Sequence, residues 1–289
     1  MWEEYSSPKS VQEALEILQS CKGQARIIAG GTDLIPELKE QTRKVKCLVD
    51  IVGIEPLKKI EQDGDNIKIG AGVTHSDVAS SKLIRKKAAV LAEAASAVGS
   101  PLIRNQGTVV GNVVNAQPAA DTAVALSALE AKAEITFVGG VRLIPLDELY
   151  EGIGVSKIDS TSEIVTSLHF KSLTNDQGSA FDRLARRKAL ALPMLNVAVV
   201  VTVQNGRFEE ARIMVAPVAP MPFRARRAEA ALRGTATSLD SINKAAGLAA
   251  VEAQPRDSQL RGSAEYRKEM VKVLVRRALE QATQRAKQR

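Results

Sequence analysis

Two glycine-containing motifs suggest where this chain binds a ligand. The first runs from Ile27 to Leu34 and reads IIAGGTDL. Gly30 and Gly31 allow the backbone to adopt positive φ and to turn its amides outward, and a helix start after them would add partial positive charge, a combination that suits a diphosphate. An ordinary tight turn between a strand and a helix is the alternative. The segment has neither the GxGxxG nor the P-loop pattern, so a kinase or NTPase is not indicated.

The second motif, IRNQGTVVGN, begins at Ile103 and continues through VVNAQPAAD to Asp121. Small residues and side-chain amides dominate it, so the main chain can approach a flat or extended ligand closely. Asn112 and Asp121 offer hydrogen bonds to sugar hydroxyls. A buried pair of glycine-rich strands, with Asp121 as a helix N-cap, is the alternative interpretation.

Other reactive side chains give weaker signals. His75 and His169 are the only histidines, and neither adjoins a serine or cysteine nucleophile, so we expect structural roles, with a polar contact to a ligand still open for His75. Cys21 and Cys47 do not form a CxxC pair, so the chain cannot supply a structural zinc site or a cysteine-ligated iron-sulfur cluster. Any metal is therefore expected in a partner.

Composition and charge narrow the class of protein. The 289 residues are 45% hydrophobic and 25% charged, which is typical of a globular chain. The net charge is +7, but aromatic residues make up only 3%, too few for a base-stacking surface, so nucleic-acid binding is not expected. No apolar run approaches the roughly 18 residues of a membrane span, and we expect no transmembrane segment and a cytoplasmic location.

The pattern of elements predicts an α+β protein in three parts. Residues 1–56 are predicted to form a small α/β unit. It has a helix that begins after Ser10, and a strand, glycine turn and helix over residues 25–39. Residues 57–174 read as a second α/β domain with a hairpin around Gly139, and a turn-rich linker over residues 173–179 follows. Residues 175–289 read as an α+β domain with a hairpin at Asn205 and three helices, over 224–232, 239–251 and 264–287.

With their order and surroundings, the two motifs resemble the FAD-binding subunit or domain of the molybdenum hydroxylases, such as xanthine dehydrogenase and aerobic carbon monoxide dehydrogenase. The similarity covers nearly the whole chain and includes AGGTDL at 29–34, IGAGVTHSDVA at 69–79, IRNQGTVVGNVVNAQPAAD at 103–121, VAPMPFRARRAEAALRG at 218–234 and SAEYRKEMVKVLVRRAL at 263–279. It implies a two-domain FAD-binding fold of the vanillyl-alcohol oxidase (PCMH) type, followed by a C-terminal α+β domain with a small antiparallel sheet and helices.

The resemblance also implies which residues hold FAD, position by position. The amides of the first motif would bind the diphosphate, and residues of the second would hold the diphosphate, ribityl and sugar groups. Ile158 would pack near the adenine or flavin end, and Arg183 stands where the family has a basic residue after an aromatic one. The implied cofactor-binding residues are Ile27, Ile28, Ala29, Gly30, Gly31, Thr32, Asp33, Leu34, His75, Thr108, Gly111, Asn112, Asn115, Asp121, Ile158 and Arg183. No catalytic or metal-binding residue is implied in this chain.

Three features depart from the family pattern. Val110 replaces the first glycine of a usual pair, which would crowd the cofactor or merely shift a strand. Ala191 replaces an acidic residue in the segment Ala189 to Pro193, which lies near the isoalloxazine in relatives, so flavin reactivity or the acceptor would differ. The chain also has no cysteine-rich insert, so an additional iron-sulfur cluster in this subunit is not indicated.

The function that the resemblance implies is electron transfer. FAD in this chain would take electrons from iron-sulfur clusters in a separate small subunit and pass them to NAD, a quinone or another acceptor, while a separate large subunit carries the molybdenum cofactor. We expect a dimer of heterotrimers. A free-standing FAD oxidoreductase and a redox-silent assembly subunit are the alternatives.

Overall fold

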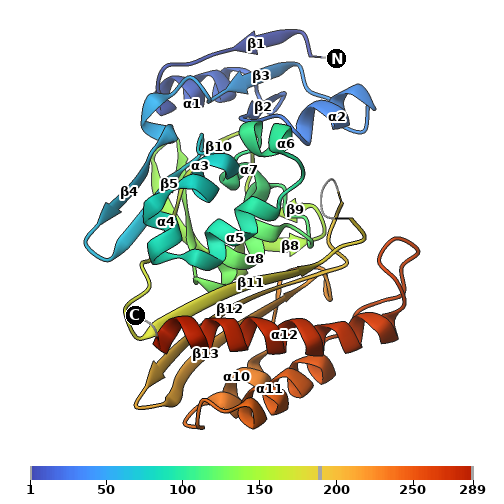
Figure 1. Ribbon diagram of the computed structural model, residues 1–289. Coiled ribbons are helices and arrows are strands. Elements are labelled where there is room, and N and C mark those ends of the chain that lie inside the picture. The colour runs from blue at the N-terminus through green and yellow to red at the C-terminus, as the bar shows by residue number, and fades with distance from the viewer. Residues whose placement is uncertain (1, 188–190, 288–289) are drawn as a thin grey trace. The chain divides into compact units, whose positions relative to one another are not determined.

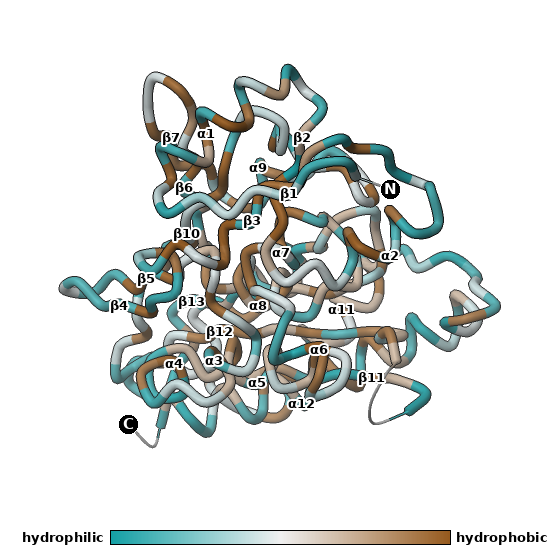
Figure 2. The backbone as a smooth tube through the Cα atoms, turned by 90° about the horizontal axis from the view of Figure 1, so that it is seen from above, coloured by the Kyte–Doolittle hydropathy of each residue, from teal (hydrophilic) through white to brown (hydrophobic). Residues whose placement is uncertain are grey.

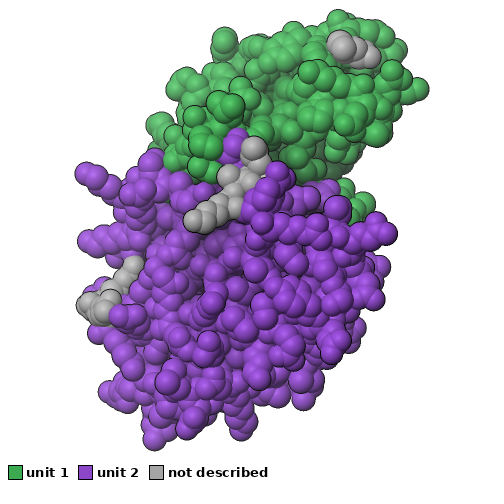
Figure 3. Space-filling view, turned by 45° about the vertical axis from the view of Figure 1, so that its right-hand side comes forward, with its two compact units in different colours: residues 1–78, 101–116, 130–171 green, residues 79–100, 117–129, 172–289 purple. Residues whose placement is uncertain are grey.

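The computed structural model describes residues 2–187 and 191–287. The chain forms two compact units (Figure 3): unit 1 contains residues 1–78, 101–116 and 130–171, and unit 2 contains residues 79–100, 117–129 and 172–289. Helices and sheets occur in both, which confirms the predicted α+β class. The division at residues 56 and 174 stays a prediction.

Unit 1 begins with a three-stranded parallel sheet in the order β1 (Glu4–Ser6), β3 (Cys47–Asp50), β2 (Ala25–Ile28). Parallel strands require crossover connections, and these contain α1 (Val11–Ser20) after β1 and α2 (Leu34–Lys39) after β2. As predicted, Ser10 caps α1, because its hydroxyl accepts a hydrogen bond from the Glu13 amide at 3.1 Å. A 3₁₀ helix over Glu55–Lys58 follows β3.

The second sheet of unit 1 is antiparallel and has the order β4 (Ile60–Asp63), β5 (Asn66–Gly70), β10 (Glu163–Lys171), β6 (Lys132–Phe137), β7 (Gly140–Pro145). The predicted hairpin is β6–β7, and Gly139 adopts φ +102° in its turn. The edge strand β4 is largely hydrophilic and exposed (Figure 2). The unit's remaining elements are α3 (His75–Ser80), which begins in it, α6 (Pro101–Gln106), α7 (Val109–Val114), α9 (Leu146–Leu149), β8 (Tyr150–Gly152) and β9 (Val155–Ser156).

Unit 2 is built around the antiparallel sheet β11 (Gln177–Leu184), β12 (Leu195–Gln204), β13 (Arg207–Ala216), β14 (Phe223–Arg224). Eight successive residues of β12, Leu195 to Thr202, are buried, as expected for a strand covered on both faces. In Figure 1, α5 (Ala89–Ala97) and α8 (Asp121–Ala128) lie on one side of this sheet. The other side carries α10 (Arg226–Leu232), α11 (Leu239–Glu252) and α12 (Ala264–Lys287). A further helix, α4, spans Lys82–Lys87.

Two predicted elements of unit 2 occur as expected. The turn between β12 and β13 has Asn205 at φ +50° and Gly206 at φ +72°, which confirms the hairpin predicted from this pair of residues. Helix α12 has the bounds predicted for the last helix. Within the described ranges, none of the helices combines the length and the apolar character needed to span a lipid bilayer.

Candidate functional site

The first motif forms the turn between β2 and α2 in unit 1. Of its two glycines only Gly31 has positive φ, +67°, so the prediction of left-handed backbone holds for one of them. The backbone N–H groups of residues 30–33 donate to no acceptor among the described residues. Asp33 immediately precedes α2 without capping it through its side chain, and burial together with Glu37 raises the pKa of its carboxyl group. The turn therefore offers several free backbone donors to an anionic group.

The two motifs meet in space. A Cβ atom on Gly30 would lie 2.0 Å from the carbonyl oxygen of Gln106, so no side chain fits there without separating the loops. A Cβ atom on Gly107 would lie 3.4 Å from both Thr32 Oγ1 and His75 Cδ2. The structure thus brings the first motif, the start of the second and His75 together within unit 1.

Residues 73–75 hold the second motif through main-chain hydrogen bonds. The His75 amide donates to the Gly107 carbonyl at 3.0 Å, and the Val109 amide donates to the Val73 carbonyl at 3.1 Å. The His75 side chain is 2% exposed, and its Nδ1 has no hydrogen-bond partner among the described residues. Burial, with a smaller effect of Arg104, lowers its pKa to about 4, so the ring is neutral at pH 7.

The second motif contains a short helix where the sequence suggested glycine-rich strands. Thr108 is the N-cap of α7, and its Oγ1 accepts a hydrogen bond from the Gly111 amide at 3.0 Å. A Cβ atom on Gly111 would lie 2.9 Å from this same oxygen, which explains the glycine. Val110 is 4% exposed and packs inside the protein. The idea that it shifts a strand is wrong because residues 109–114 are helical.

Three other predicted residues also belong to unit 1. Asn112 lies in α7 and Asn115 is its C-cap, and both are partly exposed. The Ile158 side chain is buried. Their contacts with a cofactor stay predictions.

In unit 2, Asp121 and Arg183 lie together. The side chain of Asp121 is 6% exposed, and its Oδ1 lies 3.5 Å from Arg183 Nε. Asn196 Nδ2 also donates to this oxygen, at 2.7 Å. Burial raises the pKa of Asp121 to about 6, although Arg183 and Asn196 both act to lower it. Asp121 is the first residue of α8 and Ala120 is its N-cap, so the alternative that made Asp121 the cap is wrong.

Arg183 also holds main-chain oxygens. Its Nη1 donates to the Ala97 carbonyl at 2.7 Å, and its Nη2 donates to the Ala191 carbonyl. The segment that departs from the family pattern is thereby fixed to β11 at Ala191, whereas Ala189 and Leu190 lie outside the described residues. Asn196 was missed by the sequence analysis because a lone asparagine in an apolar strand carries no motif; its polarity inside such a run is the signal that could have found it.

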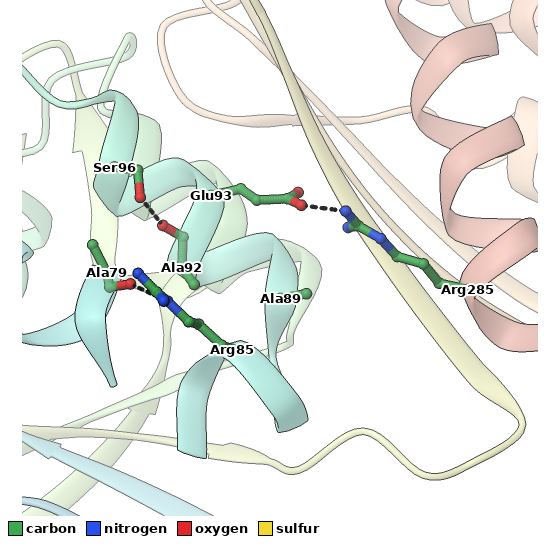
Figure 4. Close-up of a pocket in the computed structure, with 7 residues that line it drawn as sticks. All are labelled: Ala79, Arg85, Ala89, Ala92, Glu93, Ser96 and Arg285. Carbon is green, nitrogen blue, oxygen red and sulfur yellow. Dashed lines mark hydrogen bonds and ion pairs between the residues drawn. The ribbon is translucent and has the colours of Figure 1, made fainter. Parts of the chain in front are cut away.

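A separate cavity of about 510 Å³ in unit 2 contains none of the predicted residues (Figure 4). Its polar lining includes Arg285, which donates to Glu93 Oε1 at 2.5 Å, and Arg85, which donates to the Ala79 carbonyl at 2.7 Å. The guanidinium groups that line this cavity are therefore bound to other groups of the same chain.

Comparison with known families gives two matches that together span most of the chain. The family described as FAD binding domain in molybdopterin dehydrogenase matches residues 2–170. The family described as CO dehydrogenase flavoprotein C-terminal domain matches residues 179–282.

Individual relatives agree with these matches over nearly full length. The chain is 33% identical over 284 residues to the carbon monoxide dehydrogenase medium chain of Afipia carboxidovorans, covering 98% of each. It is 27% identical over 281 residues to the xanthine dehydrogenase FAD-binding subunit of Escherichia coli O157:H7, covering 96% of this chain and 95% of that one. A chain of carbon monoxide dehydrogenase from Hydrogenophaga pseudoflava superposes with a TM-score of 0.92 at 31% identity, covering 99% of this chain and 98% of that chain.

Proposed function

The chain belongs to the family of FAD-binding subunits of the molybdenum hydroxylases, and from this premise we propose that it is the electron-transfer subunit of a heteromeric dehydrogenase. It is an oxidoreductase subunit whose cofactor is FAD. In the proposed role, the chain would hold FAD between iron-sulfur clusters in a partner, which would supply electrons, and an external acceptor, which would receive them.

One observation carries the proposal: the two glycine motifs meet, and the first presents unpaired amides. Gly30 lies against Gln106, and the N–H groups of residues 30–33 donate to no described acceptor. Such a group of backbone donors suits the charge of a diphosphate, so the residues present fit FAD.

We assign the following tasks to the chain's residues. The amides of residues 28–34 bind the diphosphate, and Thr108 keeps α7 in place so that Gly111, Asn112 and Asn115 can reach the diphosphate and ribityl groups. Asp121 binds a sugar or ribityl hydroxyl. FAD, when bound, supplies the capacity to accept and release electrons, and the protein orients it and sets its hydrogen bonds.

Partners follow from the same premise. Relatives carry names of multi-subunit enzymes, among them the 6-hydroxypseudooxynicotine dehydrogenase complex of Paenarthrobacter nicotinovorans. We propose a small subunit with iron-sulfur clusters, a large subunit with the molybdenum cofactor, and a dimer of such heterotrimers. A location in the cytoplasm stays a prediction from the sequence.

The first test is the visible spectrum of the native protein, followed by release of its flavin on denaturation. We expect one non-covalently bound FAD per chain. A colourless native protein that also fails to take up added FAD would refute the proposal.

A substitution then tests the assigned loop. In Gly31→Val a β-branched side chain would occupy a residue with φ +67°, and its Cβ atom would lie 3.1 Å from atoms of Ile28 and Ile35. We expect loss of FAD with a folded chain, measured by flavin content and circular dichroism.

The matched control is Gly64→Val, in the turn between β4 and β5. Gly64 has φ +57°, but no atom lies within 4 Å of the position that a Cβ atom would take, so backbone strain is similar while the motif is untouched. If Gly31→Val kept its flavin, or Gly64→Val lost it equally, residues 28–34 would not be the diphosphate loop.

A further inference from the structure

A buried polar cluster in unit 2 engages one carboxylate oxygen of Asp121 and not the other. Oδ1 accepts a hydrogen bond from Asn196 Nδ2 at 2.7 Å and lies 3.5 Å from Arg183 Nε. Oδ2 accepts no hydrogen bond from any described residue. It is also not fully enclosed by the protein. The carboxylate therefore has one oxygen fixed by the protein and one oxygen open to a donor.

The two groups that hold Oδ1 lie on paired strands and make further contacts with the main chain. Arg183 on β11 and Asn196 on β12 are directly paired across the sheet, and Asn196 has no exposed surface. The same amide of Asn196 also donates to the Ala119 carbonyl at 3.3 Å, just before α8. Asn196 Oδ1 and Arg183 Nε are buried without a hydrogen-bond partner, a costly arrangement for groups that serve stability alone.

We propose that Asn196 and Arg183 are positioning residues, which hold Asp121 Oδ1 and so direct Oδ2 to accept a hydrogen bond from a hydroxyl group of FAD. This deepens the proposed function and rests on it. It assigns a role to Asn196, and it changes that of Arg183 from a cofactor ligand to a group that acts through Asp121.

The charge of Asp121 makes the arrangement testable, because an ionised Oδ2 is a much stronger acceptor than a protonated carboxyl group. Burial raises the pKa of Asp121 to about 6, and the hydrogen bond from Asn196 acts in the opposite direction. Arg183 faces Asp121 from β11. On the other elements packed against α8, Glu93 of α5 is paired with Arg285, and Arg212 of β13 is paired with Glu210.

The experiment measures FAD affinity between pH 5 and pH 8 by quenching of flavin fluorescence. The protein is purified with the chains that accompany it and is then freed of flavin. For the wild type we expect affinity to fall as the pH decreases through about 6. In Asn196→Leu, loss of the amide donor should move this midpoint upward by about one pH unit. In Asp121→Asn the pH dependence should vanish.

The matched control is Thr202→Val on the same strand. Thr202 is buried and accepts a hydrogen bond from Gln177 at 3.2 Å, so this variant also removes a polar contact of β12, and it should keep the wild-type midpoint. Asn196→Leu with an unchanged midpoint, or a wild type with no pH dependence, would overturn the inference while leaving FAD binding intact. Should Asn196→Leu fail to fold, a pH dependence that persists in Asp121→Asn would overturn it equally. Absence of FAD binding at every pH would instead refute the proposed function.

Discussion

Gly30 and Gly31 are adjacent, yet each is required for a different physical reason. Gly31 needs a left-handed backbone, which the motif itself predicts. Gly30 needs room, because the carbonyl of Gln106 occupies the position of a side chain. A sequence can suggest the first requirement, since it is local, but not the second, since it depends on a contact with a distant segment. Asn196 combines both cases: its polarity within an apolar strand is visible in the sequence, but its proposed role depends on its contact with the distant Asp121.

The buried carboxyl of Asp121 predicts a pH-dependent stability. Its pKa in the folded chain is about 6 against an ordinary value of 3.8, so the folded state binds the proton more tightly than the unfolded chain does. The stability contributed by this protonated carboxyl is present below about pH 4 and is lost as the pH rises through about 6. Asp121→Asn removes that titration. Relative to wild type, the variant should gain on the order of 3 kcal/mol in free energy of unfolding between pH 4 and pH 7.

Urea unfolding of both flavin-free proteins at several pH values measures this difference. The pKa of about 6 already includes the attraction of Arg183, which acts only on the ionised carboxylate. Any change in packing caused by the amide adds an amount that does not depend on pH, so only the slope with pH is diagnostic. If the difference in free energy of unfolding between the variant and the wild type stayed constant, or if the variant became relatively less stable as the pH rises, Asp121 would not be a buried acid with a raised pKa.

Secondary structure with a local cause was predictable, and elements that depend on packing were not. The turn at Asn205–Gly206 and helix α12 occur where predicted, because turn chemistry and helical periodicity are properties of neighbouring residues. Helix α7 was missed. It has six residues, of which four are valines and one is glycine, so its intrinsic propensity is low. A helix this short is stabilised by its cap at Thr108 and by burial rather than by its own sequence.

This difference changes what is expected of Val110. If Val110 lay in a strand, Val110→Gly would lower the free energy of unfolding by up to about 1 kcal/mol. Because Val110 is a buried residue of a helix, replacing it removes apolar burial, and glycine also lowers helix propensity. We therefore expect the free energy of unfolding to fall by about 3 kcal/mol in Val110→Gly and by about 2 kcal/mol in Val110→Ala. FAD affinity should stay equal or improve in the folded variants.

Thermal unfolding and flavin titration separate the two effects. Val141→Ala is the matched control, because Val141 is 60% exposed on β7 and the same change there should cost less than about 0.5 kcal/mol. A folded Val110→Ala that has lost FAD would mean that the valine packs against the cofactor.

At the scale of the whole molecule, chain order and spatial units differ. Residues 79–100 and 117–129 belong to unit 2, although they lie between segments of unit 1 along the chain. The reason is packing: α5 and α8 lie against strands of the β11–β14 sheet, which come much later in the sequence. The predicted division into 1–56, 57–174 and 175–289 used only continuous segments. A local sequence pattern does not predict that a helix will pack against a sheet formed much later in the chain.

The proposed role also makes a prediction about assembly. Cys21 and Cys47 are the chain's only cysteines, and two thiols cannot hold a cluster that needs four ligands. If FAD here receives electrons from iron-sulfur clusters, those clusters must be in another chain. Purification under native conditions through a tag on this chain should therefore recover a small subunit containing iron and acid-labile sulfide and a large subunit containing molybdenum.

Metal analysis and native mass spectrometry of the purified material test this, and two copies of each chain are expected. The net charge of +7 favours acidic partner surfaces, so association should slow as salt is raised. A yellow monomer that turns over a substrate unaided would favour a free-standing oxidoreductase, because its electrons would then need no second chain. A colourless chain that still recovers both partners would favour the redox-silent assembly subunit, since it would separate the binding of partners from the binding of flavin.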